Sequence, residues 1–308
     1  MDKFNVSVSP HIKSNVTTQR IMIDVLIGLA PVTVAAIVLF GVRALAIICV
    51  CLACSVLCEF VSQKIMKRTV TVSDCSAAVT GLLLALSLPA NAPLWQAAIG
   101  CVFAIVVVKQ LFGGLGQNFA NPAVTARVMM LISFSNSLAV ATNTVFFDSV
   151  TSATPLAMIN DPNNGAVPDY LQLFLGNHAG TIGETCSLAL LIGGIYLLVR
   201  KVITWHEPVV FIGTVMLLSI AFGRDPLTEV LTGGVLIAAF FMATDYVTTP
   251  AQTYGRMLFG FGCGLITVII RVYGNYPEGV SFAILLMNIL TPYIDNWTKK
   301  KVIGGAAK

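Results

Sequence analysis

The chain carries little charge, and this scarcity limits what it can be. Only 10% of its 308 residues are Asp, Glu, Lys or Arg, against about 25% in an ordinary soluble domain. Hydrophobic residues make up 56%. So few charged groups cannot cover a water-exposed surface, which excludes a soluble enzyme and makes lipid the main solvent. The net charge of +4 comes from dispersed basic residues and does not indicate nucleic-acid binding.

Sequence signals of several other functions are also missing. The first twenty residues contain no apolar run and no small-residue cleavage site, so we expect the first hydrophobic segment to be an anchor that is not removed. No G-x-G-x-x-G follows a predicted strand, and no ferredoxin-like cysteine run is present. Neither dinucleotide binding nor a ferredoxin-type cluster is therefore expected in this chain.

Most of the eight cysteines lie inside apolar runs, where cysteine packs as a small hydrophobic residue. Cys51, Cys54 and Cys58 would lie near one face of a helix, which leaves an iron–sulfur site open. A fourth ligand at cluster spacing does not accompany them. Packing is the favoured interpretation, and no metal site is predicted.

Long apolar segments account for most of the chain. A helix that crosses a bilayer needs about 20 mostly apolar residues. Ten segments reach or approach this length: 21–41, 44–62, 75–89, 94–112, 122–140, 184–201, 207–223, 228–245, 256–273 and 279–296. The sequence therefore predicts an all-α polytopic membrane protein with about ten transmembrane helices.

Two of these segments look interrupted. The third is short and ends in the Pro-containing stretch 88–93, and the eighth ends at 242–245, shortly before Pro250. Interrupted segments at matching places in two halves are typical of inverted-repeat membrane proteins. Residues 80–85 also resemble residues 232–238, and five spans per half is an odd number. The predicted fold is thus two inverted five-helix repeats with discontinuous third and eighth helices.

The basic residues indicate the orientation. With a cytoplasmic N-terminus, fourteen Lys and Arg residues fall on the inner side and only Arg43, Arg224 and Arg271 on the outer side, which agrees with the positive-inside rule. The loop between the halves contains no Lys or Arg. The predicted organisation is a cytoplasmic segment 1–20, a first repeat 21–140, an extracytoplasmic loop 141–183, a second repeat 184–296 and a cytoplasmic basic tail 297–308.

The outer loop contains a run of small and hydroxyl residues. Such a run can simply cap the next helix, or it can let a bulky group reach a hydroxyl. The run contains Asp148, Thr151, Ser152, Ala153 and Thr154, and it resembles the acceptor sequence of flavin transferases, with Ser152 where glycine is usual. This resemblance implies that the phosphate of FMN is esterified to Thr154.

Several further stretches extend the resemblance over nearly the whole chain. They are residues 9–11, 114–123, 183–185, 203–208, 240–245 and 276–283. Together they resemble the NqrB/RnfD family, and the Rnf branch in particular, because the N-terminal extension usual in the NqrB branch is absent.

The resemblance implies a urea-transporter-like fold in a bacterial cytoplasmic membrane. It also implies an electron-transfer role, without a bond-making active site, in an Rnf complex that couples ferredoxin:NAD⁺ oxidoreduction to Na⁺ or H⁺ translocation. The implied partners are a flavin transferase and the Rnf subunits named A, B, C, E and G, and riboflavin is suggested as a second, non-covalent flavin.

Other polar residues are weaker candidates. The Gly/Asn-rich inner turn 113–121 offers the amides of Gln117, Asn118 and Asn121 for a pocket around the second flavin. Asp24 and Asp245 lie within or at the end of predicted spans, where ionisable groups are costly and indicate function by default. Both are candidates for an ion pathway.

Arg271 is unusual because it lies on the outer side, against the charge bias. One interpretation is that it binds the FMN phosphate, since a guanidinium can grip an anion through two hydrogen bonds. The other is that it pairs with Glu278 across the next turn. The sequence leaves both open.

Other classes of function also stay open. Inverted repeats and broken helices occur in passive channels and secondary transporters, and a structural scaffold for other subunits would need no cofactor. An NqrB-like subunit of a Na⁺-pumping quinone reductase is a closer alternative. The acceptor sequence around Thr154 favours the electron-transfer role, because a transporter has no use for a tethered flavin.

The predicted topology can be tested by cysteine-accessibility labelling. Four predicted spans precede Asn118 and nine precede Asn275, so cysteines introduced at these positions should react from opposite sides of the membrane. Labelling of both from one side would contradict the inverted repeat.

Overall fold

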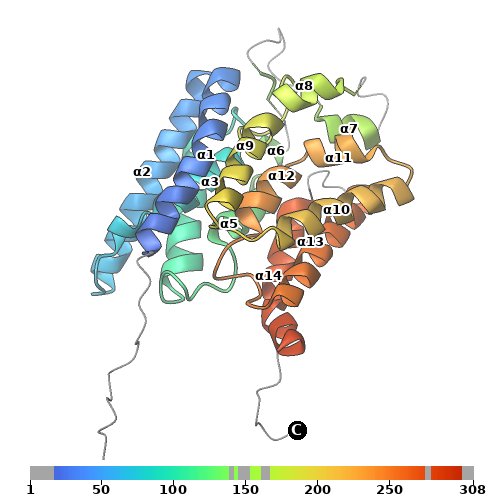
Figure 1. Cartoon of the computed structure of the whole chain (residues 1–308). Coiled ribbons are helices and arrows are strands. Elements are labelled where there is room, and N and C mark those ends of the chain that lie inside the picture. Colours follow the sequence, from blue (N-terminus) through green and yellow to red (C-terminus); the bar gives the residue numbers. More distant parts are fainter. Residues whose placement is uncertain (1–16, 139–141, 145–152, 161–166, 275–278, 300–308) are drawn as a thin grey trace, which may run out of the picture.

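A computed structural model describes residues 17–138, 142–144, 153–160, 167–274 and 279–299, and this part of the chain is helical and contains no strand (Figure 1). The helices of the first half are α1 Thr18–Phe40, α2 Val42–Ile65, η1 Val72–Asp74, α3 Ser76–Leu86, α4 Leu94–Val102, the π-helical segment η2 Phe103–Gln110, α5 Pro122–Ser133 and α6 Ser135–Leu138. Two short helices follow in the segment between the halves, α7 Pro155–Asn160 and α8 Tyr170–Leu175. The second half contains α9 Ser187–Val199, α10 His206–Ala221, α11 Pro226–Leu231, α12 Val235–Ile237, the π-helical segment η4 Ala238–Met242, α13 Thr253–Tyr273 and α14 Val280–Thr298.

Local sequence explains where several helices begin. Asn121 precedes α5 and accepts hydrogen bonds from the backbone N–H groups of Ala123 and Val124. Asp225 precedes α11 in the same way and accepts from the N–H of Thr228. In both helices proline occupies the first turn, where its missing N–H costs nothing.

The expected spans differ in how completely the structure forms them. Within the described ranges, α1, α2 and α13 are long and apolar enough to cross a membrane as single helices. Five further apolar segments are shorter, between 10 and 17 residues, and α14 is long enough but contains several polar residues. The structure is thus that of a helical membrane protein, and ten full-length spans are not seen in the described part of the chain.

The third segment is short, as predicted, because α3 ends at Leu86. The eighth is interrupted earlier than predicted. Its first helix, α11, ends at Leu231, and Gly233 and Gly234 then adopt φ values of 62° and 73°, a conformation that glycine tolerates and other residues rarely adopt. The segment then ends at Met242, where the sequence predicted its end, so the break at Gly233 and Gly234 is an additional interruption. The similar stretch 80–85 lies inside the continuous helix α3, so the two stretches have different local structures.

Backbone N–H groups from another part of the chain donate hydrogen bonds to the carbonyls at the end of α3. The carbonyl of Leu86 accepts from the N–H of Gly183 at 2.7 Å, and that of Leu88 accepts from the N–H of Ile182 at 2.9 Å. A helix that stops in an apolar interior must find such partners for its last carbonyls. The chain that leads into the second half therefore completes the broken helix of the first half.

The two halves pack against each other through corresponding helices. α1 contacts α9, and α5 contacts α14, while within the halves α2 contacts α4 and α10 contacts α13. Figure 1 shows the start of α1 and the end of α14 at one end of the molecule, and α7 and α8 at the opposite end. The contacts of α1 with α9 and of α5 with α14 thus join the two halves.

A substitution at Gly193 tests the close packing between α1 and α9. A Cβ at this position would collide with the carbonyl oxygen of Gly28, so Gly193→Ala should separate the helices and lower the thermal stability of the purified subunit. Gly213, in the middle of α10, is a matched control because an added Cβ there meets nothing within 4 Å. Gly213→Ala should be neutral or stabilising by roughly 0.5–1 kcal/mol. Equal stability of the two variants would contradict this packing.

Candidate functional site

The predicted acceptor Thr154 directly precedes α7. It is half-buried, its Oγ1 accepts a hydrogen bond from the N–H of Ala157 at 3.2 Å, and its carbonyl accepts from the N–H of Met158 at 3.0 Å. Thr154 therefore caps the helix, which is the simpler of the two roles that its sequence allowed. Ala153 is adjacent, whereas Asp148, Thr151 and Ser152 lie outside the described residues.

Helix α7 is anchored at both of its ends. Leu156 is 2% exposed, and its side chain fills the space that a Cβ on Gly233 would occupy. At the other end, the Oδ1 of Asn160 accepts a hydrogen bond from the Nη2 of Arg224 at 2.6 Å. The helix that follows the acceptor therefore lies against the break between α11 and α12.

One buried carboxylate binds two arginines beneath this helix. The Oε2 of Glu229 lies 2.7 Å from the Nη1 of Arg271, and its Oε1 lies 2.9 Å from the Nη1 of Arg224. The side chains of Glu229 and Arg271 are each 1% exposed, and that of Arg224 is 16% exposed. Buried charges need such partners, because an unpaired ion in an apolar interior is very costly.

Arg271 also donates hydrogen bonds to backbone carbonyls at the end of α11, where the eighth segment is interrupted. Its Nη1 donates to the carbonyl of Glu229 at 2.6 Å, and its Nη2 donates to the carbonyls of Thr232 and Gly233 at 3.2 and 3.1 Å. These are carbonyls of the kind that a helix end leaves without helical partners. The buried Arg271 thus has a structural explanation at the break.

Neither sequence-based interpretation of Arg271 included this arrangement. Glu278 lies outside the described residues, and a phosphate at the guanidinium would have to compete with Glu229. Glu229 was missed because 42 positions separate it from Arg271, and no periodic pattern connects the two.

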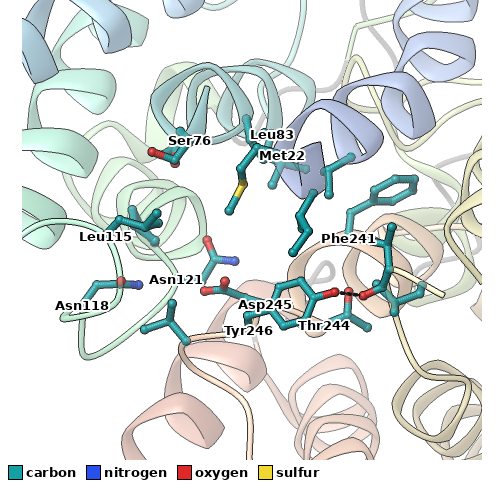
Figure 2. A pocket seen from close by; sticks show the side chains of 18 of the residues that line it. Met22, Ser76, Leu83, Leu115, Asn118, Asn121, Phe241, Thr244, Asp245 and Tyr246 are labelled. Atoms are coloured by element: carbon teal, nitrogen blue, oxygen red, sulfur yellow. Dashed lines mark hydrogen bonds between the residues drawn. The ribbon is translucent and has the colours of Figure 1, made fainter. Parts of the chain in front are cut away.

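A second site lies between the halves, at the end of the molecule where α1 begins. It is a cavity of about 80 Å³. Its lining combines α1, α3, η2, the turn before α5 and the chain after η4, and Figure 2 shows Asn118, Asn121 and Asp245 around the same space. The structure thus brings together residues that the sequence had assigned to two separate roles. Gln117 is exposed and does not line the cavity.

A buried ion pair forms part of this cavity's surroundings. The Nζ of Lys109, which lines the cavity, lies 2.6 Å from the Oε1 of Glu59 and 2.5 Å from the Oγ of Ser76, and the Nε2 of Gln110 donates to the same Glu59 oxygen at 3.0 Å. Lys109 belongs to a π-helical segment, a geometry frequent at functional sites. The sequence did not predict this pair, whose members are 50 positions apart.

Asp24 has a more local environment. Its Oδ1 accepts from the hydroxyl of Tyr196 at 3.1 Å, and its Oδ2 lies 3.3 Å from the Nη2 of Arg200. It does not line the cavity that contains Asp245. The two residues predicted for an ion pathway therefore do not form one site in the described structure, and Asp24 connects α1 to α9.

A smaller cavity, of about 30 Å³, lies where the two broken segments meet. Ser87 from the end of α3 and Gly233 and Gly234 from the break after α11 line it, together with Arg127 and Glu184. Both interruptions therefore border one small cavity inside the protein. This arrangement agrees with the general expectation for broken helices in membrane proteins.

The cysteines of α2 do not form a metal site in the structure. Cys51 and Cys101 are buried, and the Sγ of Cys101 lies 3.6 Å from the carbonyl oxygen of Cys51. Within the described ranges, no group of three or more His, Cys, Asp or Glu side chains is arranged to hold a metal ion.

A substitution at Glu229 tests whether its ion pairs with Arg224 and Arg271 stabilise the protein. Glu229→Gln leaves two arginines without their shared carboxylate, and the loss of one partner of a buried ion pair costs about 3–5 kcal/mol. We expect a clear fall in the thermal unfolding temperature of the purified subunit. Near-wild-type stability would contradict the cluster.

The neighbouring Asp225→Asn is a matched control. Burial alone would raise the pKa of Asp225, but hydrogen bonds from Thr228 outweigh it and hold that pKa below its usual value. Asparagine is also a good N-cap, so the expected cost is about 1 kcal/mol or less.

The sequence of this chain is similar to those of known membrane-complex subunits. The model of the family described as "NQR2, RnfD, RnfE family" matches residues 5–304. The D component of the Na⁺-translocating ferredoxin:NAD⁺ oxidoreductase complex of Acetobacterium woodii is 46% identical over 99% of this chain and 97% of its own length. The D component of the proton-translocating counterpart in Clostridium ljungdahlii is 39% identical over 98% and 96%.

A more distant relative is the D component of the ion-translocating oxidoreductase complex of Escherichia coli O7:K1, which is 35% identical over 98% of each chain. These matches confirm the resemblance to the Rnf branch that the motifs predicted, and they agree with a bacterial membrane location. The chain belongs to the NQR2, RnfD, RnfE family and is a subunit of an ion-translocating oxidoreductase complex.

Proposed function

We propose that this chain is the membrane electron-transfer subunit of an Rnf complex and carries FMN as a phosphoester on Thr154. In this role it would help couple ferredoxin:NAD⁺ oxidoreduction to Na⁺ or H⁺ translocation, the activities named for its relatives. The observation that carries the proposal is the acceptor sequence that ends at Thr154, on a residue held at the start of an anchored helix.

The surroundings of Thr154 fit an ester. Its Oγ1 is held by the N–H of Ala157, and among the described residues the hydroxyl donates to no acceptor. The oxygen is therefore oriented while its proton can be replaced by phosphorus. Half-burial leaves one side of the side chain open to a bulky group.

Charge near the acceptor favours a reduced flavin. Two arginines share one glutamate beneath α7, so the cluster of Arg224, Glu229 and Arg271 carries a net charge of +1. The flavin, when bound, supplies the electron-transfer chemistry, and the protein supplies position and electrostatics. A nearby positive charge stabilises the negative charge that a flavin gains on reduction.

We also propose the finer architecture read from the sequence. Two inverted five-span repeats are supported by the pairing of counterpart helices, α1 with α9 and α5 with α14, and by the convergence of both breaks on one cavity. Cytoplasmic termini and an extracytoplasmic acceptor loop are supported by the Lys/Arg distribution and by the position of α7 opposite the start of α1 (Figure 1).

The proposal does not extend to riboflavin in the inner cavity. That space, of about 80 Å³, is suited to a few water molecules or a small ion, since a single ordered water needs roughly 10–15 Å³. A flavin ring there would require Met22, Tyr246 or their neighbours to move. The expected partners are the other Rnf subunits, named A, B, C, E and G, and a flavin transferase for Thr154.

Replacement of the acceptor tests the proposal. Thr154→Ala removes the only side-chain atom of this residue that could form the ester, so the fluorescent band of this subunit in a denaturing gel should disappear while the protein stays in the membrane. Thr151→Ala is the control and should retain the band, because its hydroxyl would only shape the loop. Covalent flavin in the Thr154→Ala variant would refute the assignment.

A further inference from the structure

The segment that carries the acceptor is connected to the membrane interior by a continuous chain of polar contacts. Asn160, the last residue of α7, accepts from Arg224. Arg224 binds Glu229, and Glu229 binds Arg271. Arg271 in turn donates to the carbonyls of Thr232 and Gly233 at the helix break.

A second contact fixes the other end of the same helix. Leu156 is buried, and its side chain lies where a Cβ on residue 233 would be, so it packs directly against Gly233. An apolar contact and a charge-assisted hydrogen bond therefore hold both ends of a six-residue helix, which is too short to be stable alone. The position of Thr154 depends on contacts outside its own helix.

We propose that Asn160 and Arg224 are positioning residues for the flavin acceptor, because through Glu229 and Arg271 they lock α7, and with it Thr154, onto the broken end of α11. The inference deepens the proposed function and rests on it for the flavin, whereas the lock itself is a property of the chain. A locked acceptor holds its flavin at one distance from redox partners and close to the positive cluster.

The lock also gives the broken helix a functional meaning. Gly233 and Gly234 at the break also line the small cavity that contains Arg127 and Glu184. Helix α7 therefore contacts, through Leu156, the same break that borders these buried ionisable groups. Without the lock, the flavin would move away from the cluster and lose this proximity.

The experiment uses the purified complex with Asn160→Ala, which removes the acceptor of the Arg224 hydrogen bond at an exposed position and leaves the buried ion pairs intact. Hydrogen exchange of the α7 amides should accelerate about tenfold or more, as expected for the loss of a charge-assisted hydrogen bond. Covalent flavin should remain, its fluorescence anisotropy should fall, and its midpoint potential should decrease as it leaves the positive cluster.

Two further variants separate positioning from general destabilisation. Asn160→Asp keeps a side-chain oxygen that can accept from Arg224 and should restore wild-type exchange and anisotropy, while its added negative charge beside the cluster should keep the potential below the wild-type value. Arg256→Gln is the matched arginine control, because Arg256 lies about 22 Å from Arg271 along α13 and donates hydrogen bonds only to Pro250 and Thr204 among the described residues. It should leave α7 exchange unchanged.

Unchanged α7 exchange in Asn160→Ala would overturn the lock. Faster exchange with unchanged anisotropy and potential would overturn the positioning role. If the wild-type subunit carries no covalent flavin, the proposed function fails, and the exchange measurement still decides whether α7 is locked.

Discussion

The structure depends on one constraint: a helix that stops in an apolar interior leaves carbonyl groups that need hydrogen-bond donors. Two segments of this chain stop in that way, and each is completed by a different part of the sequence. Backbone N–H groups of Ile182 and Gly183 serve the end of α3. The guanidinium of Arg271 and the hydroxyl of Ser187 serve the end of α11.

The hydrogen-bond donor for the carbonyls at the end of α11 is a charged side chain, Arg271, which lies inside the protein. Arg271 is 1% exposed, so it requires a carboxylate, and Glu229 in turn also binds Arg224. Arg224 is partly exposed and donates a hydrogen bond to Asn160, the last residue of the helix that follows Thr154. The position of Thr154 thus depends on how the backbone carbonyls at the end of α11 are hydrogen-bonded.

The two ends of the molecule have different chemistry. One end combines Thr154, the cluster of Arg224, Glu229 and Arg271, and a helix break. The other end combines Asp245, two asparagines and the Lys109–Glu59 pair around a cavity with room for water or an ion. Relatives named for Na⁺ and for protons are both closely similar over nearly the whole chain, so overall similarity does not select the ion.

The sequence by itself determined the class of protein, the family and the candidate acceptor. Low charge and long apolar runs are local properties, the short third segment follows from Pro89 and Pro93, and the acceptor motif is contiguous. The tertiary structure alone decided which distant residues meet. Arg271 binds Glu229 across 42 positions, Lys109 binds Glu59 across 50, and Asn121 donates to the carbonyl of Met242 across 121. Such contacts depend on how helices from both halves pack, and helical periodicity within one segment carries no information about the partner that the segment will face.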